Sequence, residues 1–174
     1  DATTLDPVVF EAYQHALDAT GRAFKVVATV QPTSPLLRVE TLDQAIDKIW
    51  DDPQLDTVIA ATEDAHLRWR EEGGRYVPTY GQRLNRQYLP RVFRETGAFV
   101  VTRNTSITPT SRFGDSISLQ LLDGPEAIDI DTYDDWAVCE FQLRRRRILF
   151  VVSGFPSIGL GHVYNSLLVA NDLV

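Results

Sequence analysis

The feature that most constrains this chain is the alternation of short apolar runs with helical stripes. The runs Phe24–Val30, Thr57–Thr62 and Ala98–Thr102 have the length and composition of strands buried on both faces of a sheet. Segments with apolar residues at helical spacing precede the first run and separate it from the second. This alternation predicts an α/β fold with a mostly parallel sheet, whose ligand sites lie beyond the carboxyl ends of the strands.

Capping and turn residues set the limits of the expected elements. Gly21 ends the first helix, and Thr41 opens the second through a capping box with Gln44. The alternation of apolar and acidic residues in Ala127–Asp131 predicts a short strand, and Thr132 then opens a last helix.

The composition excludes several classes of protein. With 174 residues, 44% of them hydrophobic, the chain can build one good core but not two complete domains. Its net charge of −7, with both signs mixed along the chain, argues against a basic nucleic-acid-binding protein. Cys139 alone cannot form an internal disulfide, and no apolar run approaches the roughly 20 residues needed to span a bilayer. We therefore expect a cytoplasmic protein with no nucleic-acid or membrane partner.

Two segments depart from the alternation. The long polar segment between Glu63 and Pro90 contains Gly73-Gly74 and predicts a hairpin or flap over the site. The basic run Arg144–Arg147 precedes the apolar run Ile148–Val152, which is typical of a new strand. We expect residues 1–143 to form one domain, and residues 144–174 to form a linker and the first strand and helix of a second.

Asp129 and Asp131 are candidate metal ligands. In a strand these two side chains would project from the same face, and two converging carboxylates suit Mg²⁺ that carries a substrate phosphate. They could equally be two solvated acids before a helix, the second of them helping to cap it. Spacing alone leaves both interpretations open.

Other polar groups are candidates for ligand binding. The loop Gln31–Pro35 follows a predicted strand with an amide and two hydroxyls, which suits a polyhydroxylated or anionic small molecule, although an ordinary turn has the same composition. Arg86 and Arg94 could bind carboxylate or phosphate, or form surface ion pairs. His162 follows a glycine-rich turn and could act as a base or be structural.

Four motifs follow one another along the chain: Asp1–Thr4 before a helix, Val30–Leu36, Asn85–Ala98 and Ile128–Thr132. Together they resemble the acylneuraminate cytidylyltransferases. These are the CMP-sialic acid synthetases, with close relatives that act on legionaminic and pseudaminic acids. The resemblance runs in order from Asp1 to about Leu143, and its specific parts are the proline-flanked loop and the paired aspartates.

The resemblance implies a three-layer, Rossmann-like nucleotidyltransferase fold and a Mg²⁺-dependent reaction. The anomeric hydroxyl of a nine-carbon sugar acid would attack the α-phosphorus of CTP and release pyrophosphate, in a homodimer formed through the region after Gly97. Such chemistry mainly needs positioning and charge neutralisation. By motif position, Asp129 and Asp131 would hold Mg²⁺ and act as catalytic residues. Thr4 would bind the nucleotide, Gln31 and Arg86 would bind the sugar acid, and Arg94 would lie next to these sugar-binding residues.

Two departures from the family pattern affect what we expect. Thr96 stands where the family usually has Asn, which bears on the choice of sugar. The family's opening strand and basic, glycine-rich phosphate loop have no counterpart, so we expect an N-terminally incomplete domain that does not turn over by itself. A non-catalytic dimerising or binding relative, and a nucleotidyltransferase for another sugar, are the alternatives.

The C-terminal segment resembles a second family. Residues 148–174, with Gly159-Leu160-Gly161-His162, are similar to the start of the nucleotide-sugar hydrolases and spore-coat polysaccharide proteins with a glycosyltransferase-like fold. His162 matches the glycine-flanked active-site histidine of that family. The resemblance implies a natural fusion of two steps in nonulosonic acid activation.

Overall fold

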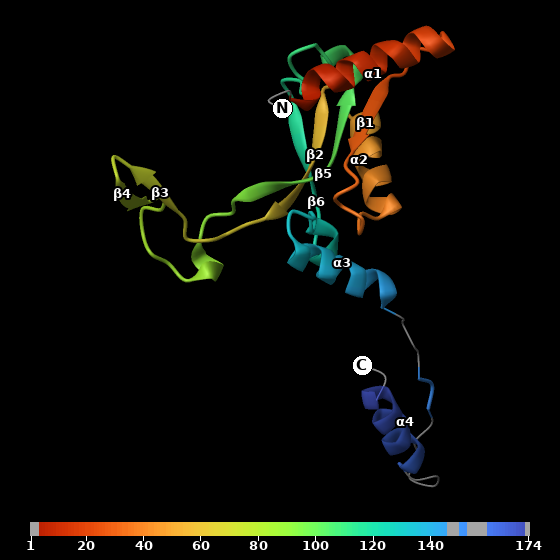
Figure 1. Ribbon diagram of the computed structural model, residues 1–174, viewed down its shortest axis with the longest axis vertical. Helices are drawn as coiled ribbons and strands as arrows, with labels where there is room; N and C mark the ends of the chain where they lie inside the picture. The colour runs from red at the N-terminus through yellow and green to blue at the C-terminus, as the bar shows by residue number, and fades with distance from the viewer. Residues whose placement is uncertain (1–3, 146–149, 153–159, 173–174) are drawn as a thin grey trace. The chain divides into compact units, whose positions relative to one another are not determined.

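The computed structural model describes residues 4–145, 150–152 and 160–172. The chain divides into two compact units, Asp1–Leu143 and Arg144–Val174. The first unit holds a four-stranded sheet of order β1-β5-β2-β6 and a separate β3-β4 hairpin (Figure 1). In chain order the elements are α1 (Leu5–Thr20), β1 (Val26–Val30), α2 (Val39–Asp51), β2 (Thr57–Glu63), β3 (Trp69–Glu72), β4 (Arg75–Pro78), η1 (Arg86–Tyr88), β5 (Phe93–Arg103), η2 (Asn104–Ser106), β6 (Ile117–Leu121), η3 (Gly124–Ala127), α3 (Tyr133–Arg144) and α4 (Gly161–Asp172).

The strand directions confirm the predicted α/β fold. Strands β1, β2 and β6 run the same way, and β2 pairs with β6 in parallel. β5 lies between β1 and β2 and is antiparallel to both, so the expectation that its residues join the parallel set is wrong. The chain returns from β2 through the hairpin segment instead of a crossover helix, and a return without a crossover brings the next strand back antiparallel.

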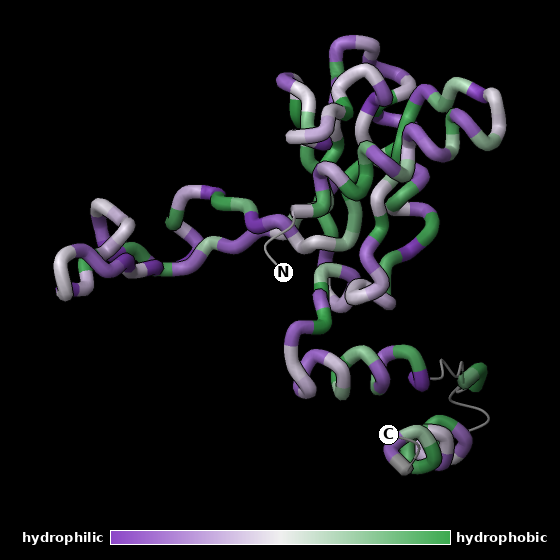
Figure 2. The backbone as a smooth tube through the Cα atoms, turned by 45° about the horizontal axis from the view of Figure 1, so that its top comes forward, coloured by the Kyte–Doolittle hydropathy of each residue, from purple (hydrophilic) through white to green (hydrophobic). Residues whose placement is uncertain are grey.

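The core lies between α2 and the sheet. Ala45 and Ile49 of α2 are fully buried and cluster with Val58, Phe99 and Leu122 of the sheet and its edge loop. Burying each of the larger side chains contributes about 1.5–3 kcal/mol to stability. Figure 2 shows the hydrophobic stretches concentrated in this part of the chain.

Strand β1 corrects one sequence prediction. Its apolar composition indicated burial on both faces, but it lies at the edge of the sheet, and Val30 is 48% exposed. Composition misleads here because apolar residues at a sheet edge are indistinguishable in sequence from those of a central strand.

Of the two helix limits predicted from capping residues, the end of the first helix is confirmed and the start of the second is wrong. Gly21 ends α1 in the left-handed conformation (φ 63°), and its N–H donates to the carbonyl of Leu17 at 2.8 Å. The capping box at Thr41 is wrong: α2 begins at Val39, so Thr41 lies inside its first turn and is buried. At the N-terminus of α2 the Arg38 N–H instead donates to the side chain of Glu126, which is too distant in sequence for a local motif to reveal.

The strand predicted at Ala127–Asp131 is also wrong. η3 ends at Ala127, and the residues after it are extended without pairing in a strand. Gly124 has a φ of 57° and Pro125 has no N–H to donate, so the chain turns before this segment instead of continuing from β6 as a paired strand.

The capping box predicted for the last helix of the first unit is confirmed. The Asp135 N–H donates to Thr132 Oγ1 at 3.2 Å, and the Thr132 N–H donates to Asp135 Oδ2 at 2.9 Å. The Thr132 hydroxyl also donates to this carboxylate, and these bonds hold the pKa of Asp135 below its usual value. Cys139 of α3 is buried, as expected, and burial raises the pKa of its thiol.

The segment after β2 forms the expected hairpin. Strands β3 and β4 pair through the turn at Gly73-Gly74, and Figure 1 shows them extending away from the four-stranded sheet instead of folding over its end as a flap. We call residues 64–92 the arm. Figure 2 shows the arm to be predominantly hydrophilic, which agrees with its lack of a core.

The second unit contains α4, whose first turn carries the exposed His162. The predicted strand Ile148–Val152 falls partly outside the described residues, and Phe150–Val152 are not in a strand. Within the part of the chain that the structure describes, no helix is long and apolar enough to cross a membrane.

Candidate functional site

Polar residues follow each of the three strands that run in the same direction. Gln31 comes directly after β1, Asp64 directly after β2, and Asp129 lies in the segment after β6. The carboxyl ends of parallel strands meet at one edge of a sheet, which is where such folds bind ligands. We call this edge the candidate site.

A break in the pairing of β2 and β5 shapes the site. The register shifts between Ile59/Val100 and Ala61/Glu95, so β5 bulges outward. Within the bulge, Gly97 has a φ of 78°, which favours glycine, and the Thr96 hydroxyl donates to the Ala60 carbonyl at 3.3 Å. Thr96 is 2% exposed, so it holds the bulge in shape from inside the protein.

The bulge brings Gly97 against Asp129 and Gln31. A Cβ on Gly97 would lie 2.9 Å from Asp129 Oδ2 and 3.9 Å from Gln31 Nε2. Gln31 is held by its N–H, which donates to the Ala98 carbonyl at 3.0 Å. Two residues of the predicted site, Gln31 and Asp129, therefore approach one glycine, where a Cβ would displace the Asp129 carboxylate.

Three oxygen atoms in the two segments that form this site are buried and have no hydrogen-bond partner among the described residues. They are Asp129 Oδ1, Thr33 Oγ1 and Ser34 Oγ, and the two segments are joined by a 2.8 Å bond from the Ile130 N–H to the Thr33 carbonyl. A buried polar atom without a partner costs roughly 1–3 kcal/mol, so nearly all such atoms in folded proteins are paired. These oxygens thus have hydrogen-bonding capacity that the described residues leave unused.

The donor atoms fit a hard cation that is shared with a substrate. Asp129 has an unpartnered oxygen, and Asp131 is exposed, with its N–H 3.3 Å from Asp135 Oδ2. The described residues contain no group of three or more His, Cys, Asp or Glu side chains that could hold a metal by themselves. Mg²⁺ is commonly held by only one or two carboxylates, with water and substrate phosphates completing its shell.

The two predicted arginines lie at the base of the arm. Arg86 is exposed in η1 and lines a depression with Glu63, Ala65 and Gln87. Arg94 is in the first part of β5, and its Nε is 4.0 Å from Asp64 Oδ2.

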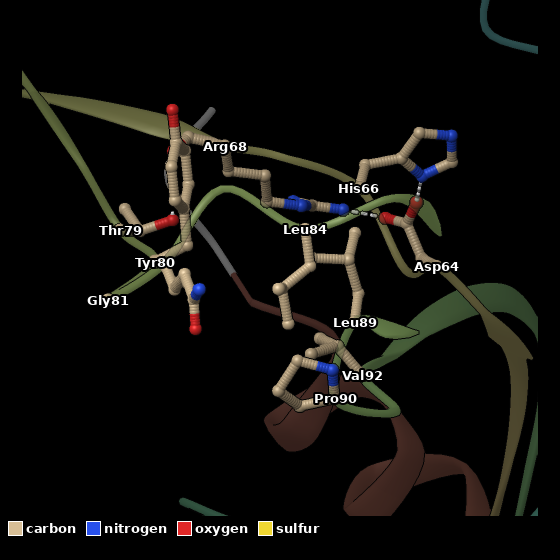
Figure 3. A pocket seen from close by; sticks show the side chains of 11 residues that line it. Asp64, His66, Arg68, Thr79, Tyr80, Gly81, Leu84, Leu89, Pro90 and Val92 are labelled. Carbon is tan, nitrogen blue, oxygen red and sulfur yellow. Dashed lines mark hydrogen bonds and ion pairs between the residues drawn. The ribbon is translucent and has the colours of Figure 1, made fainter. Parts of the chain in front are cut away.

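Asp64 is the centre of a cluster within the arm. His66 and Arg68 both pair with its carboxylate, and Figure 3 shows both side chains pointing toward it. The cluster borders a cavity of about 440 Å³ with an apolar wall that includes Leu89 and Val92. This cavity belongs to the arm, whereas the Asp129 carboxylate of the candidate site lies beside Gly97.

The structure separates Thr4 from the candidate site. Thr4 is the exposed N-cap residue of α1. Asp6, in the first turn, accepts the Arg112 N–H at 3.3 Å, and the Arg112 carbonyl accepts the Thr102 hydroxyl. Thr102 pairs with Thr57, the first residue of β2, so α1 begins at the other end of the sheet from Gln31. His162 lies in the second unit.

A partly buried ion pair joins the segments that carry Gln31 and Asp129. Arg38 Nε and NH2 donate to Glu126 Oε2 at 2.9 and 2.7 Å, and the Arg38 N–H donates to Oε1 at 3.0 Å. The Glu126 side chain is only 5% exposed, against 67% for Arg38. Burial by itself would raise the pKa of Glu126, but hydrogen bonds from Arg38 and Thr41 outweigh it and hold this pKa below its usual value.

Sequence reasoning missed Gly97, Glu126 and Asp64. An isolated glycine inside a strand pattern is a signal for a bulge, so Gly97 could have been found. Glu126 contacts a residue 88 positions away, and no local pattern predicts such a pair.

The fold is similar to that of a solved synthase structure. The crystal structure of 4-diphosphocytidyl-2C-methyl-D-erythritol synthase from Anaerococcus prevotii DSM 20548 matches with a TM-score of 0.55 and 17% sequence identity, over 83% of this chain and 68% of that one. No protein-family model matches the chain, and no curated protein matches it in sequence. The chain thus has a nucleotidyltransferase-like, Rossmann-like α/β fold.

Proposed function

We propose that this chain provides the CTP site for transfer of a cytidylyl group to a nonulosonic, sialic-type sugar acid, a transfer that the chain does not complete by itself. The products are a CMP-sugar and pyrophosphate, and the reaction serves nonulosonate or surface polysaccharide biosynthesis in the cytoplasm, where CTP is available. The name of the structural neighbour describes the synthesis of a diphosphocytidyl compound, which supports cytidylyl chemistry on this fold. The sugar acid is proposed as the acceptor because of the sequence motifs that resemble the acylneuraminate cytidylyltransferases.

The observation that carries the proposal is the buried, unpartnered Oδ1 of Asp129 beside Gln31 and Gly97. A buried carboxylate oxygen without a hydrogen-bond partner does not stabilise the fold, so its presence is explained if a ligand supplies the missing partner. Its position beyond the carboxyl ends of β1 and β6 is the usual ligand position in such sheets.

The side chains have distinct parts in the proposed reaction. Asp129 and Asp131 hold Mg²⁺, which when bound neutralises phosphate charge as the α-phosphorus is attacked. Gln31 offers its amide to the hydroxyl groups of the sugar acid, and Arg86 offers a guanidinium fork to its carboxylate. Thr96 fixes the bulge from within, so this departure from the family's Asn acts on the sugar through the shape of the bulge.

We further propose that the working form is a homodimer, as the resemblance implies. The resemblance places the interface after Gly97, and exposed apolar side chains there are consistent with contact to a second copy: Ile117 is 50%, Trp136 59% and Phe141 64% exposed. Sedimentation velocity should give twice the chain mass of 19.6 kDa. A single monomer species at every concentration tested would contradict the homodimer.

A nucleotidyltransferase for a different acceptor is the second candidate. Two observations favour it: Thr96 differs from the family pattern, and the structural neighbour is named for a methylerythritol compound. This candidate shares the CTP site and differs only in the sugar.

A thermal-shift panel of CTP, CMP, UTP and several sugar acids with Mg²⁺ tests the proposal. A nucleotide present at a hundred times its Kd stabilises the folded state by about 2.7 kcal/mol, which for a chain of this size raises the Tm by roughly 5–10 °C. We expect a rise with CTP that UTP does not reproduce, and a further rise with a nonulosonic acid. No response to any cytidine nucleotide would overturn the proposal, and a response to CTP with another sugar alone would favour the second candidate.

Arg86→Ala provides the matched variant for the acceptor. It should reduce the shift caused by the sugar acid and leave the shift caused by CTP unchanged. Arg70→Ala removes an exposed arginine that pairs with Glu72 in the hairpin, so it controls for the loss of positive charge on the arm. Equal losses in the two variants would contradict the role of Arg86.

A further inference from the structure

Two anchors fasten the segment of Asp129 to the loop of Gln31. The first is the partly buried ion pair of Arg38 and Glu126, and the second is the bond from the Ile130 N–H to the Thr33 carbonyl at 2.8 Å. Asp129 lies between Glu126 and Ile130 along the chain, so both ends of its short segment are held.

Glu126 also replaces a local helix cap. Arg38 is the N-cap residue of α2, and its own side chain makes no capping hydrogen bond. The Glu126 carboxylate instead accepts the Arg38 N–H at 3.0 Å and lies at the positive end of the α2 dipole. Because α2 packs against the sheet through Ala45 and Ile49, the ion pair ties η3 to a helix that contributes to the hydrophobic core.

The anchors oppose a movement that would otherwise be favourable. Asp129 Oδ1 is buried without a partner, so a loose segment would turn this carboxylate toward water. Gly97 leaves just enough space for Asp129 Oδ2, so a small displacement of the segment changes the site.

We propose that Glu126 and Arg38 are positioning residues, whose ion pair holds the Asp129 carboxylate beside the Gln31 loop in the geometry that binds a divalent cation together with the nucleotide. The inference rests on the proposed function, because it takes Asp129 to be a ligand of that cation. Neither residue touches substrate. Both act through the segment of Asp129.

Glu126→Gln tests the inference in the full chain, with Asp56→Asn as the matched control. Each change converts a hydrogen-bonded carboxylate of lowered pKa to an amide, but Asp56 is at the other end of the sheet, bonded to the Ser116 N–H and the Ser106 hydroxyl. Mn²⁺ prefers the same oxygen ligands as Mg²⁺ and serves as the probe in electron paramagnetic resonance titrations, with and without CTP. Amide hydrogen exchange at Ile130 reports on the second anchor without any ligand.

We expect Glu126→Gln to raise the Kd for Mn²⁺ at least tenfold and to speed exchange at Ile130 at least tenfold, with neither change in Asp56→Asn. Arg38→Lys keeps the charge but loses the fork, so it should cause a smaller change of both quantities in the same direction. Unchanged Mn²⁺ affinity in a folded Glu126→Gln protein, or equal effects in Asp56→Asn, would overturn the inference. If the unaltered chain binds no Mn²⁺ even with CTP, the proposed function fails, and unchanged exchange at Ile130 would then overturn the anchoring as well.

Discussion

Two aspartates at opposite ends of the sheet differ in how their carboxylates are satisfied. Asp56 precedes β2; its Oδ2 accepts the Ser116 N–H at 3.0 Å and its Oδ1 accepts the Ser106 hydroxyl at 3.2 Å. Asp129 follows β6, and its Oδ1 is buried without a partner. Each lies tightly against a glycine, Gly114 beside Asp56 and Gly97 beside Asp129.

The comparison separates stability from ligand binding. A carboxylate whose oxygens are all bonded by the protein can stabilise the fold but has little left for a ligand, as at Asp56. A carboxylate with an orphaned oxygen costs stability and is ready to bind, as at Asp129. An aspartate beside a glycine thus stabilises the fold at one end of the sheet and lowers its stability at the other.

The largest effect on stability is expected at the Asp56 end. In Gly114→Ala the new Cβ would lie 2.6 Å from Asp56 Cγ and 2.8 Å from its Oδ2. Such overpacking costs about 1–3 kcal/mol, and we expect the upper part of this range because the contacted atoms are fixed by hydrogen bonds. Urea unfolding measures the loss. A loss below about 0.5 kcal/mol would show that this end is not rigid.

Gly97→Ala should have a smaller effect on stability and a larger one on binding. A φ of 78° costs a residue with a side chain roughly 1–2 kcal/mol, and the new Cβ would displace Asp129. Urea unfolding and the Mn²⁺ titration are measured on the same protein. Retained Mn²⁺ affinity would contradict the role given to the contact between Gly97 and Asp129.

Asp56→Asn should cost about 1 kcal/mol at neutral pH, and the loss should depend on pH. The hydrogen bond from Ser116 is the main cause that lowers the pKa of Asp56 in the folded state. Its stabilisation is therefore complete above the ordinary aspartate pKa of about 3.9 and disappears as the pH falls through the lowered folded value. Urea unfolding of both proteins from pH 7 to pH 3 should show the two stabilities converging at the acid end. A constant difference would contradict this explanation.

Asp129→Asn should have the smallest effect on stability. Replacing a half-buried carboxylate that has an orphaned oxygen removes a cost, so we expect a change within about 0.5 kcal/mol or a slight gain. The same urea experiment measures it. A loss as large as that of Asp56→Asn would mean that the fold itself uses the Asp129 carboxylate.

Sequence reasoning found those parts of the site that local patterns encode. Gln31 was a candidate because it follows a strand-like run, and Asp129 because of its motif; the structure brings both near Gly97, and their roles stay predictions. The expected strand geometry for Asp129 and Asp131 failed because the turn at Gly124 and Pro125 ends the pairing first. The position of Thr4 depends on how α1 packs at the far end of the sheet, which is a tertiary property.

The sequence likewise predicted only those parts of the fold that local patterns encode. Apolar runs and helical stripes identified the α/β class and the positions of β1, β2 and the second half of β5, because periodicity reflects burial. The direction of β5 and the exposure of β1 depend on how strands are ordered in the sheet, and the cap of α2 depends on Glu126. No pattern within a short window contains that information.

Calorimetric titration of CTP in the presence and absence of Mg²⁺ tests the central claim most directly, with Asp129→Asn compared with Asp56→Asn. The account predicts Mg²⁺-dependent binding of CTP by the unaltered chain and by Asp56→Asn, and at least tenfold weaker binding by Asp129→Asn. Equal affinity in Asp129→Asn, or binding of CTP that is indifferent to Mg²⁺, would contradict the assignment of the nucleotide site to the edge of the sheet where Asp129 meets Gly97.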